Sequence, residues 1–249
     1  MRIQRALAVL VGFILPVLAV QAQAAEVKVF CSTALKTVLE EIGPQFEKAT
    51  GNKLAVTVAP TAGLRAQIDH GAAFDVVLLT ASATDDLAKA GKIDPSSRTA
   101  IARAGLGAAT LKSAPKLDIG TSDAFKRTLL GAKSIGMNKQ GASSATFNAL
   151  FEKLGVAAEV KPKVKLLDGA AGEAVAKGEV ELGLTQISEL LPYAEDQAAP
   201  LPADIQTYTT FSGGVSAASQ ESDVAKSLLK FLTAPGAIPV IQAKGMEPG

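Results

Sequence analysis

Strand-type apolar runs alternate with amphipathic helical patterns along most of the chain, and this alternation limits the fold more than any other feature. The first apolar run, 27–30, precedes a helical pattern over 34–50 in which apolar residues recur at helical spacing. Two more such pairs follow, with strands expected at 53–58 and 73–79 and helices at 64–70 and 84–90. Consecutive strand–helix units predict a parallel sheet with helices on both faces and right-handed crossovers.

A second set of strand and helix patterns follows the first. The predicted strands are 105–111, 133–137, 163–167, 181–185, 206–211 and 215–217, and the predicted helices are 124–130, 145–154, 172–177 and 224–233, with a last short helix from Pro235. The Pro- and Ala-rich stretch 198–204 is expected to be an exposed connector. Two lobes with crossing segments near 102–106 and 204–212 fit this layout. Lobe 1 is expected to comprise 25–104 and 207–249, and lobe 2 to comprise 105–206.

The first 24 residues have the pattern of a cleaved signal peptide. Arg2 and Arg5 precede an uncharged apolar run over 6–20, and Ala22 and Ala24 supply the small residues before a cleavage site. This run is short for a bilayer span, which needs about 20 residues. The sequence therefore predicts export of a soluble protein, and a permanent N-terminal anchor is the alternative.

The composition excludes several classes of protein. The 25 Lys and Arg residues nearly balance 24 Asp and Glu residues, so the chain has no dominant basic field for nucleic acid. A single cysteine, Cys31, excludes a disulfide framework, and with one histidine, His70, there is no set of residues for a zinc site or a Cys/His nucleophile pair. We expect Cys31 to be a buried small apolar residue and His70 to lie on the surface. No metal or cofactor is predicted.

Three strand-to-helix loops are rich in small and hydroxyl-bearing residues, namely 31–34, 60–63 and 141–144. In open α/β sheets, ligands bind beyond the carboxyl ends of the strands, where helix N-termini present free N–H groups. These loops therefore predict a site for a small anion. The alternative is that their Ser and Thr side chains only cap helices. The expected ligand contacts in the loops are Ser32, Thr33, Ala34, Thr61, Ala62, Gly63, Ser143 and Ser144.

Four stretches carry a family resemblance: VKVFCSTALKTVLEEIGPQFEKATG, PTAGLRAQI, AFDVVLLTAS and LFEKLG. They resemble the periplasmic molybdate-binding proteins of ABC transporters, and the similarity covers 26–249. The resemblance implies an α/β fold of the type II periplasmic binding class, with two lobes of mainly parallel sheet flanked by helices and a two-segment hinge. It implies a monomeric periplasmic receptor, not an enzyme, that holds a small anion between the lobes and docks on an ABC transporter permease.

The ligand residues that the resemblance implies differ from the family pattern at two positions. Ala34 stands where the family has a ligand serine, and Gln186 lies near the place of the family tyrosine that closes the site, whereas Thr61 keeps a hydroxyl. Ala170 completes the expected contacts. Unpaired buried donors cost about 1–3 kcal/mol each, so such changes redirect specificity. The predicted ligand is an organic carboxylate or a molybdate-like oxyanion.

Arg103 lies at the first crossing segment, in the run IARAGLG. Its planar guanidinium matches a carboxylate, which favours an organic acid as ligand, and a solvated hinge arginine is the alternative. Arg65 in the helix after the second loop has the same two interpretations, and Asp75 is expected to be a structural hydrogen-bonding acid.

Two other functions stay open: a secreted hydrolase that uses one of the hydroxyl loops, and an exported domain that binds no solute.

Overall fold

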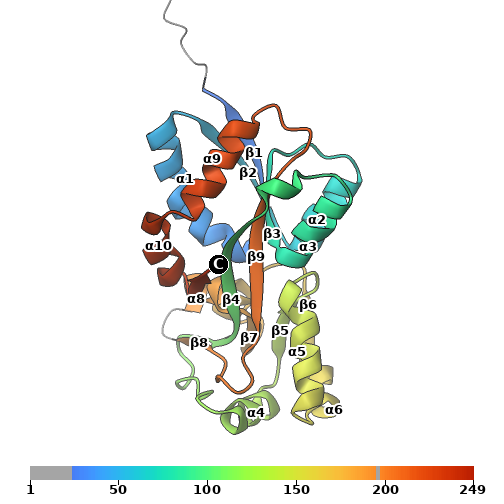
Figure 1. Ribbon diagram of the computed structural model, residues 1–249. Helices are drawn as coiled ribbons and strands as arrows, with labels where there is room; N and C mark the ends of the chain where they lie inside the picture. The colour runs from blue at the N-terminus through green and yellow to red at the C-terminus, as the bar shows by residue number, and fades with distance from the viewer. Residues whose placement is uncertain (1–23, 195–196) are drawn as a thin grey trace, which may run out of the picture.

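The computed structural model describes residues 24–194 and 197–249, so the predicted signal peptide lies outside the described residues except for residue 24. Two lobes are stacked along the direction of the two longest strands, and helices cover each lobe (Figure 1). The expected α/β architecture is confirmed.

The first lobe is built on three parallel strands with helices on both faces. The strands are β1 (Glu26–Ser32), β2 (Lys53–Ala59) and β3 (Val76–Thr80), in the order β2-β1-β3, and the helices are α1 (Lys36–Thr50), α2 (Thr61–Asp69), α3 (Ala81–Lys89), α9 (Ser222–Leu232) and α10 (Ile238–Ala243). Val76 and Leu78 of β3 pack in a core with α1 and α9, whereas Val77 and Leu79 pack in a second core with α2 and α3. Burial on both faces explains why β3 is continuously apolar.

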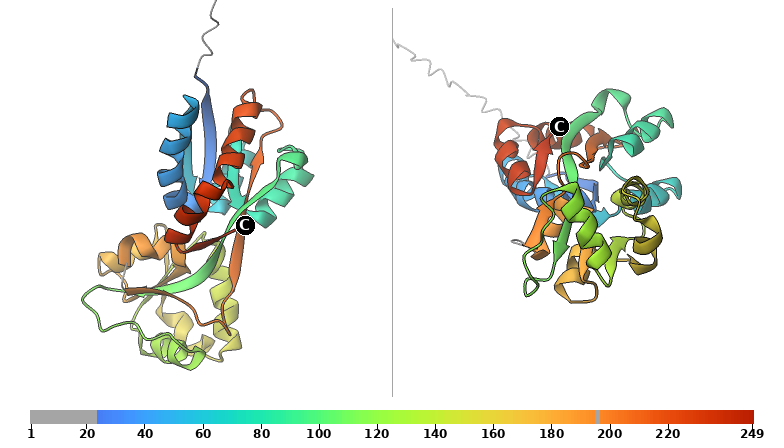
Figure 2. Two further views of the ribbon diagram at one scale, coloured as in Figure 1. Left: turned by 60° about the vertical axis from the view of Figure 1, so that its left-hand side comes forward. Right: turned by 90° about the horizontal axis from the view of Figure 1, so that it is seen from below.

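Two long antiparallel strands pass through both lobes and join them. They are β4 (Thr99–Thr110) and β9 (Tyr208–Val215), and Figure 2 shows them running side by side between the lobes. β4 pairs with β9 over 99–105 and with β7 over 106–110, so one strand belongs to both halves of the sheet. The lobes therefore share one sheet of order β2-β1-β3-β9-β4-β7-β5-β6.

The second lobe surrounds a separate core. Its strands are β5 (Ile135–Asn138), β6 (Val164–Leu167) and β7 (Leu182–Gln186), and its helices are α4 (Ser122–Gly131), α5 (Ala142–Lys153), α6 (Ala157–Val160), α7 (Ala171–Ala176) and α8 (Ile187–Ala194). The short strands β8 (Ala198–Pro200) and β10 (Met246–Pro248) both pair with β4, and 3₁₀ turns occur at Thr33–Leu35, Pro95–Ser97, Lys161–Lys163 and Pro235–Ala237. Phe125, Phe147 and Phe151 are fully buried in this core.

The structure corrects several of the predicted elements. The stretch 198–204 is not only an exposed connector, because Ala198–Pro200 forms β8 and Leu201 is buried. A single strand, β9, runs from the predicted strand 206–211 to the start of the predicted strand 215–217, and residues 206–207 and 216–217 lie outside it. Helix α8 was not predicted. Helices α2, α3 and α5 each begin three residues before their predicted starts, so residues expected in loops lie in their first turns.

Among the described residues, no helix by itself has the length and apolar character to cross a membrane. Only the bent pair Ser222–Leu232 and Pro235–Ala243, with 56° between its halves, meets that requirement by length and composition.

Candidate anion-binding site

A cavity of about 620 Å³ lies between the lobes, beside β9. Figure 1 shows α2 and α3 of the first lobe above α5 of the second at this point. The cavity is lined by residues from the starts of all three helices and from β9: Thr61, Ala62, Arg65, Thr80–Ala83, Gln140–Ala142, Ala145 and Tyr208–Thr210. The carboxyl end of the sheet in both lobes therefore faces one shared cavity.

Two of the three helices begin without a side-chain cap. Pro60 precedes α2 and Gly141 precedes α5, and neither residue caps its helix through a side chain. Ser32, before the 3₁₀ turn that leads into α1, makes no capping bond either. The alternative that the Ser and Thr residues of these loops serve as N-caps is therefore wrong. Free N–H groups at a helix N-terminus, together with the helix dipole, attract an anion.

In the first lobe, two buried hydroxyl groups connect the first and second loops. Thr61 Oγ1 donates a hydrogen bond of 3.3 Å to Ser32 Oγ, and Ser32 is only 4% exposed. Thr61 lines the cavity, and Ser32 is connected to it through this hydrogen bond.

In the second lobe, a chain of polar groups runs from α5 to β9. Ser143, in the first turn of α5, lies 3.2 Å from Thr185, oxygen to oxygen, and both residues are 1% exposed. Thr185 Oγ1 donates to Gln186 Oε1 at 3.1 Å, and Gln186 Nε2 donates to Thr209 Oγ1 at 3.4 Å. Thr209 lines the cavity, so the chain connects Gln186 with the site.

Glu189 joins this polar network, and sequence reasoning missed it. It lies in the first turn of α8, directly after β7, and is partly buried. Burial raises the pKa of its carboxyl group to about 7, although hydrogen bonds with Thr185 and Thr33 oppose the shift. Thr33 belongs to the first lobe and Thr185 to the second, so Glu189 lies where the lobes meet.

Arg65 is the arginine among the residues that line the cavity. Its Nη1 donates to the Ala83 carbonyl oxygen at 3.2 Å, and Asp69 and Asp86 stand at 4.0 and 3.9 Å from its terminal nitrogens. Its Nε is buried and has no acceptor among the described residues. The side chain is 25% exposed, so part of the guanidinium remains accessible from the cavity.

Arg103 is not among the residues that line the cavity, although it lies next to Tyr208, which is one of them. Its Nε donates to Glu247 Oε2 at 2.6 Å, and its guanidinium lies 4.8 Å from the centre of the Tyr208 ring. Three other predicted contacts also have different surroundings. Ala34 is part of the lobe 1 core, Ser144 donates to the Asn138 carbonyl oxygen at 2.6 Å, and Ala170 lines a separate pocket of about 180 Å³.

Gly63 faces the opposite lobe. A β-carbon at this position would lie 3.2 Å from Gln140 Oε1. Glycine therefore lets the first turn of α2 approach the loop before α5, across the cavity.

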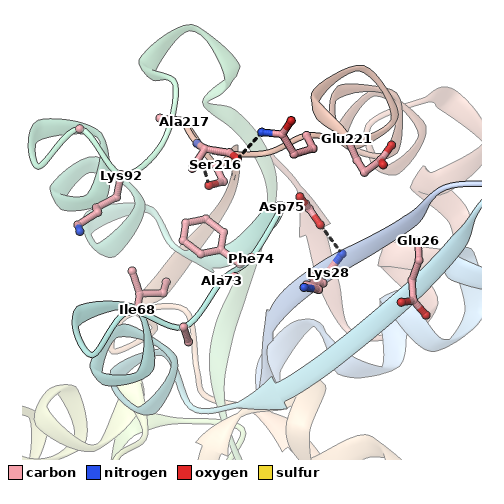
Figure 3. Close-up of a pocket in the computed structure, with 15 residues that line it drawn as sticks. Glu26, Lys28, Ile68, Ala73, Phe74, Asp75, Lys92, Ser216, Ala217 and Glu221 are labelled. Carbon is pink, nitrogen blue, oxygen red and sulfur yellow. Dashed lines mark hydrogen bonds between the residues drawn. The ribbon is translucent and has the colours of Figure 1, made fainter.

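A larger cavity, of about 660 Å³, lies in lobe 1 at the opposite end of the strands (Figure 3). Its lining includes Glu26 at the start of β1 and Gly71, just beyond the C-terminal end of α2. A helix C-terminus carries partial negative charge, which disfavours an anion here. Asp75 in this cavity accepts bonds from Lys28 N at 2.8 Å and Ser219 Oγ at 2.6 Å, as expected for a structural acid.

The expectations for Cys31 and His70 are confirmed. Cys31 is fully buried and free, and His70 is exposed. Within 24–194 and 197–249, no group of three or more His, Cys, Asp or Glu side chains is arranged to hold a metal ion.

Comparisons with known proteins agree with this arrangement. The family model of the bacterial extracellular solute-binding proteins matches residues 27–247. The chain is 31% identical over 227 residues to an aconitate isomerase of Pseudomonas sp, covering 88% of this chain and 87% of the relative. It is 30% identical over 237 residues to the molybdate-binding protein ModA of Azotobacter vinelandii, covering 92% of each.

Among solved structures, the periplasmic molybdate-binding protein of Azotobacter vinelandii superposes with a TM-score of 0.78 at 19% identity, over 90% of this chain and 99% of that one. This similarity confirms the expected type II periplasmic binding fold. The family match over nearly the whole described chain, together with the shared fold, shows that the chain belongs to the bacterial extracellular solute-binding protein family.

Proposed function

We propose that this chain captures a small organic polycarboxylate between its lobes in the periplasm and delivers it to an ABC transporter permease. The ligand would lie against the N-termini of α2, α3 and α5. Closure of the lobes would follow from contacts that the ligand makes with both lobes at once.

The choice of a carboxylate as the ligand depends mainly on the position of Arg65. Its buried Nε lacks an acceptor among the described residues, at the wall of a cavity where three helix N-termini meet. A guanidinium offers paired N–H groups in one plane, which match a carboxylate, whereas a tetrahedral oxyanion can be held by neutral donors alone. Arg65 therefore favours a carboxylate over molybdate.

The names of two relatives support a small anion with more than one negative charge as the ligand. One is named for aconitate, a tricarboxylate, and the other for molybdate, a doubly charged oxyanion. At two positions where the molybdate-binding pattern has hydroxyl groups, this chain has Ala34, which packs in the lobe 1 core, and Gln186, which bonds to the cavity-lining Thr209.

Thermal unfolding with a panel of anions tests the choice of ligand. The panel contains molybdate, tungstate, sulfate, phosphate, and di- and tricarboxylates, aconitate among them. A ligand at 100 times its dissociation constant stabilises the folded state by about 2.7 kcal/mol. We expect the tricarboxylates to raise the midpoint more than molybdate does. Selective stabilisation by molybdate, or no stabilisation by any anion, would contradict the proposal.

An Arg65→Gln variant tests whether Arg65 binds the ligand carboxylate. A hydrogen bond to a charged group contributes about 1.5–3 kcal/mol, so calorimetric titration should show carboxylate affinity reduced by about 10- to 100-fold. The matched control is Arg98→Gln, because Arg98 pairs with Asp85 in the same lobe and does not line the cavity. Equal losses in the two variants would show that Arg65 does not bind the ligand.

A further inference from the structure

Strand β2 lies at one end of the shared sheet, and in the described chain no other strand pairs with its outer edge. Lys53 N donates to the carbonyl oxygen of the residue before β1 at 2.8 Å, whereas Leu54 N faces away from β1 and donates to Glu47 Oε1 at 2.8 Å. Main-chain groups alternate in direction along a strand, so those of Val56 and Val58 also face outward. A free edge of this kind presents N–H and C=O groups to which another strand can bond.

The outer edge of β2 also carries apolar side chains. Val56 and Val58 lie on the same side of the strand and are 43% and 38% exposed. Residues 54–59 contain no charged side chain and no proline, and β2 pairs with β1 over its whole length without a bulge. Charges, prolines, bulges and short strands are the features that normally protect a free edge from pairing. In β2 only Lys53, its first residue, is of this kind.

The opposite end of the sheet has a protected edge. Strand β6 is only four residues long and contains Lys165, whose Nζ donates to the Glu179 carbonyl oxygen at 3.1 Å. Leu166 of β6 is 61% exposed, but it lies beside this lysine on a short strand. The two ends of the sheet therefore differ, because the edge at β6 is short and charged and the edge at β2 is long and uncharged.

A second copy of β2 fits this edge in one antiparallel register. If Val56 of each copy lies on a two-fold axis, Leu54 of one strand lies opposite Val58 of the other, so the outward-facing residues are matched. Lys53 then lies opposite Ala59, and no like charges meet. The Lys53 ammonium group is also neutralised by a carboxylate of its own chain at 3.0 Å. Apolar side chains that face each other across paired strands stabilise the pairing.

The main-chain groups fit the same register. The Val56 residues of the two copies would each donate an N–H group to the carbonyl oxygen of the other, and Val58 N would donate to the Leu54 carbonyl oxygen. The pairing would end at Leu54, because its N–H group is already bonded to Glu47. A two-fold pair uses the free edge of both copies, so association would stop at the dimer.

We propose that two copies of this chain associate through β2, so that one sheet continues into the other. This inference goes beyond ligand capture, and it differs from the monomer that the family resemblance implies. No residue of β2 lines the cavity between the lobes. Each copy in the dimer therefore keeps its own ligand site.

Sedimentation equilibrium of the full mature chain over a wide concentration range tests the association, and we expect a monomer–dimer equilibrium. Val56→Lys would place two like charges on residues whose Cα atoms are about 5.5 Å apart. The dissociation constant of the dimer should therefore rise at least about tenfold. The matched control is Leu166→Lys, at an exposed apolar residue of the other edge, with the wild-type constant expected. A wild-type chain that stays monomeric, or equal weakening by both substitutions, would overturn the proposal.

An exchange of charges tests the register. Val56→Lys and Val56→Glu should each weaken the dimer, because like charges meet at the two-fold axis. An equimolar mixture of the two variants should associate more strongly than either alone, because a lysine then faces a glutamate. Circular dichroism verifies that each variant is folded. A mixture that associates no more strongly than its components would show that the two Val56 residues do not face each other, and the proposed pairing would be wrong.

Discussion

The Arg103 guanidinium on β4 pairs with Glu247 on β10, with 2.6 Å between Arg103 Nε and Glu247 Oε2. Glu247 also accepts a hydrogen bond from Tyr208, which raises the pKa of the tyrosine. Arg103 thus holds the C-terminal strand against the crossing strands, and its guanidinium is already occupied.

We therefore predict that Arg103→Gln changes carboxylate affinity by less than about twofold, in contrast to Arg65→Gln. Both partners of the Arg103 pair are about half exposed, so the free energy of unfolding should fall by no more than about 1 kcal/mol. Calorimetric titration and urea unfolding measure the two quantities. A tenfold loss of affinity would instead place Arg103 at the ligand, as the sequence alone suggested.

The contrast between the two arginines shows what could be predicted from the sequence. Alternating apolar runs predicted the strand–helix units, because burial on both sheet faces requires continuous apolar strands such as β3. The run around Arg103 did not show on which side of β4 the arginine lies. In the structure Ala102 and Ala104 are fully buried and Arg103 points outward, to β10, which is more than 140 residues away in sequence.

The helix starts and Glu189 were missed for a related reason. Small residues in the first turns of α2, α3 and α5 contribute no apolar periodicity, so those turns were predicted as loops. Glu189 follows β7 without a turn residue between strand and helix, and Pro192 interrupts the helical pattern of α8. A glutamate followed by Leu190 and Leu191 does not show from sequence alone that it faces the opposite lobe, because that contact depends on how β4 and β9 join the lobes.

Close packing of β9 leads to a second prediction. A β-carbon at Gly213 would overlap Leu229 of α9 and lie 3.2 Å from Leu78 of β3. Overpacking costs about 1–3 kcal/mol, so Gly213→Ala should lower the free energy of unfolding by that amount. Urea unfolding followed by circular dichroism measures it, since the chain has no tryptophan.

The control for Gly213→Ala is Gly236→Ala, because no atom lies within 4 Å of a β-carbon at Gly236. That substitution should leave the free energy of unfolding unchanged or raise it slightly, through the lower entropy of the unfolded chain. Equal destabilisation by both variants would show that packing between β9 and α9 is not the cause.

The burial of Cys31 predicts its reactivity. Burial, and secondarily the charge of Glu40, raises the pKa of its thiol far above the usual range. The thiolate is the reactive form, so the folded protein should not react with a disulfide reagent such as Ellman's reagent at pH 8. One thiol per chain should react in guanidinium chloride. Rapid reaction of the folded protein would mean that β1 opens readily.

Ionisation of Glu189 predicts how stability depends on pH. Burial raises the pKa of its carboxyl group from its ordinary value of 4.5, which applies in the unfolded chain, to about 7 in the folded protein. The folded state therefore binds the proton more tightly, and this contribution to stability is present below pH 4.5 and is lost as the pH rises through 7. The loss amounts to at most about 3 kcal/mol. Urea unfolding at pH 5 and pH 8 should show a decrease in the free energy of unfolding that is larger in the wild type than in Glu189→Gln. Glutamine cannot ionise, so an equal decrease in both proteins would assign the pH dependence to other groups. It would also mean that the Glu189 carboxyl group is exposed to water rather than buried between the lobes.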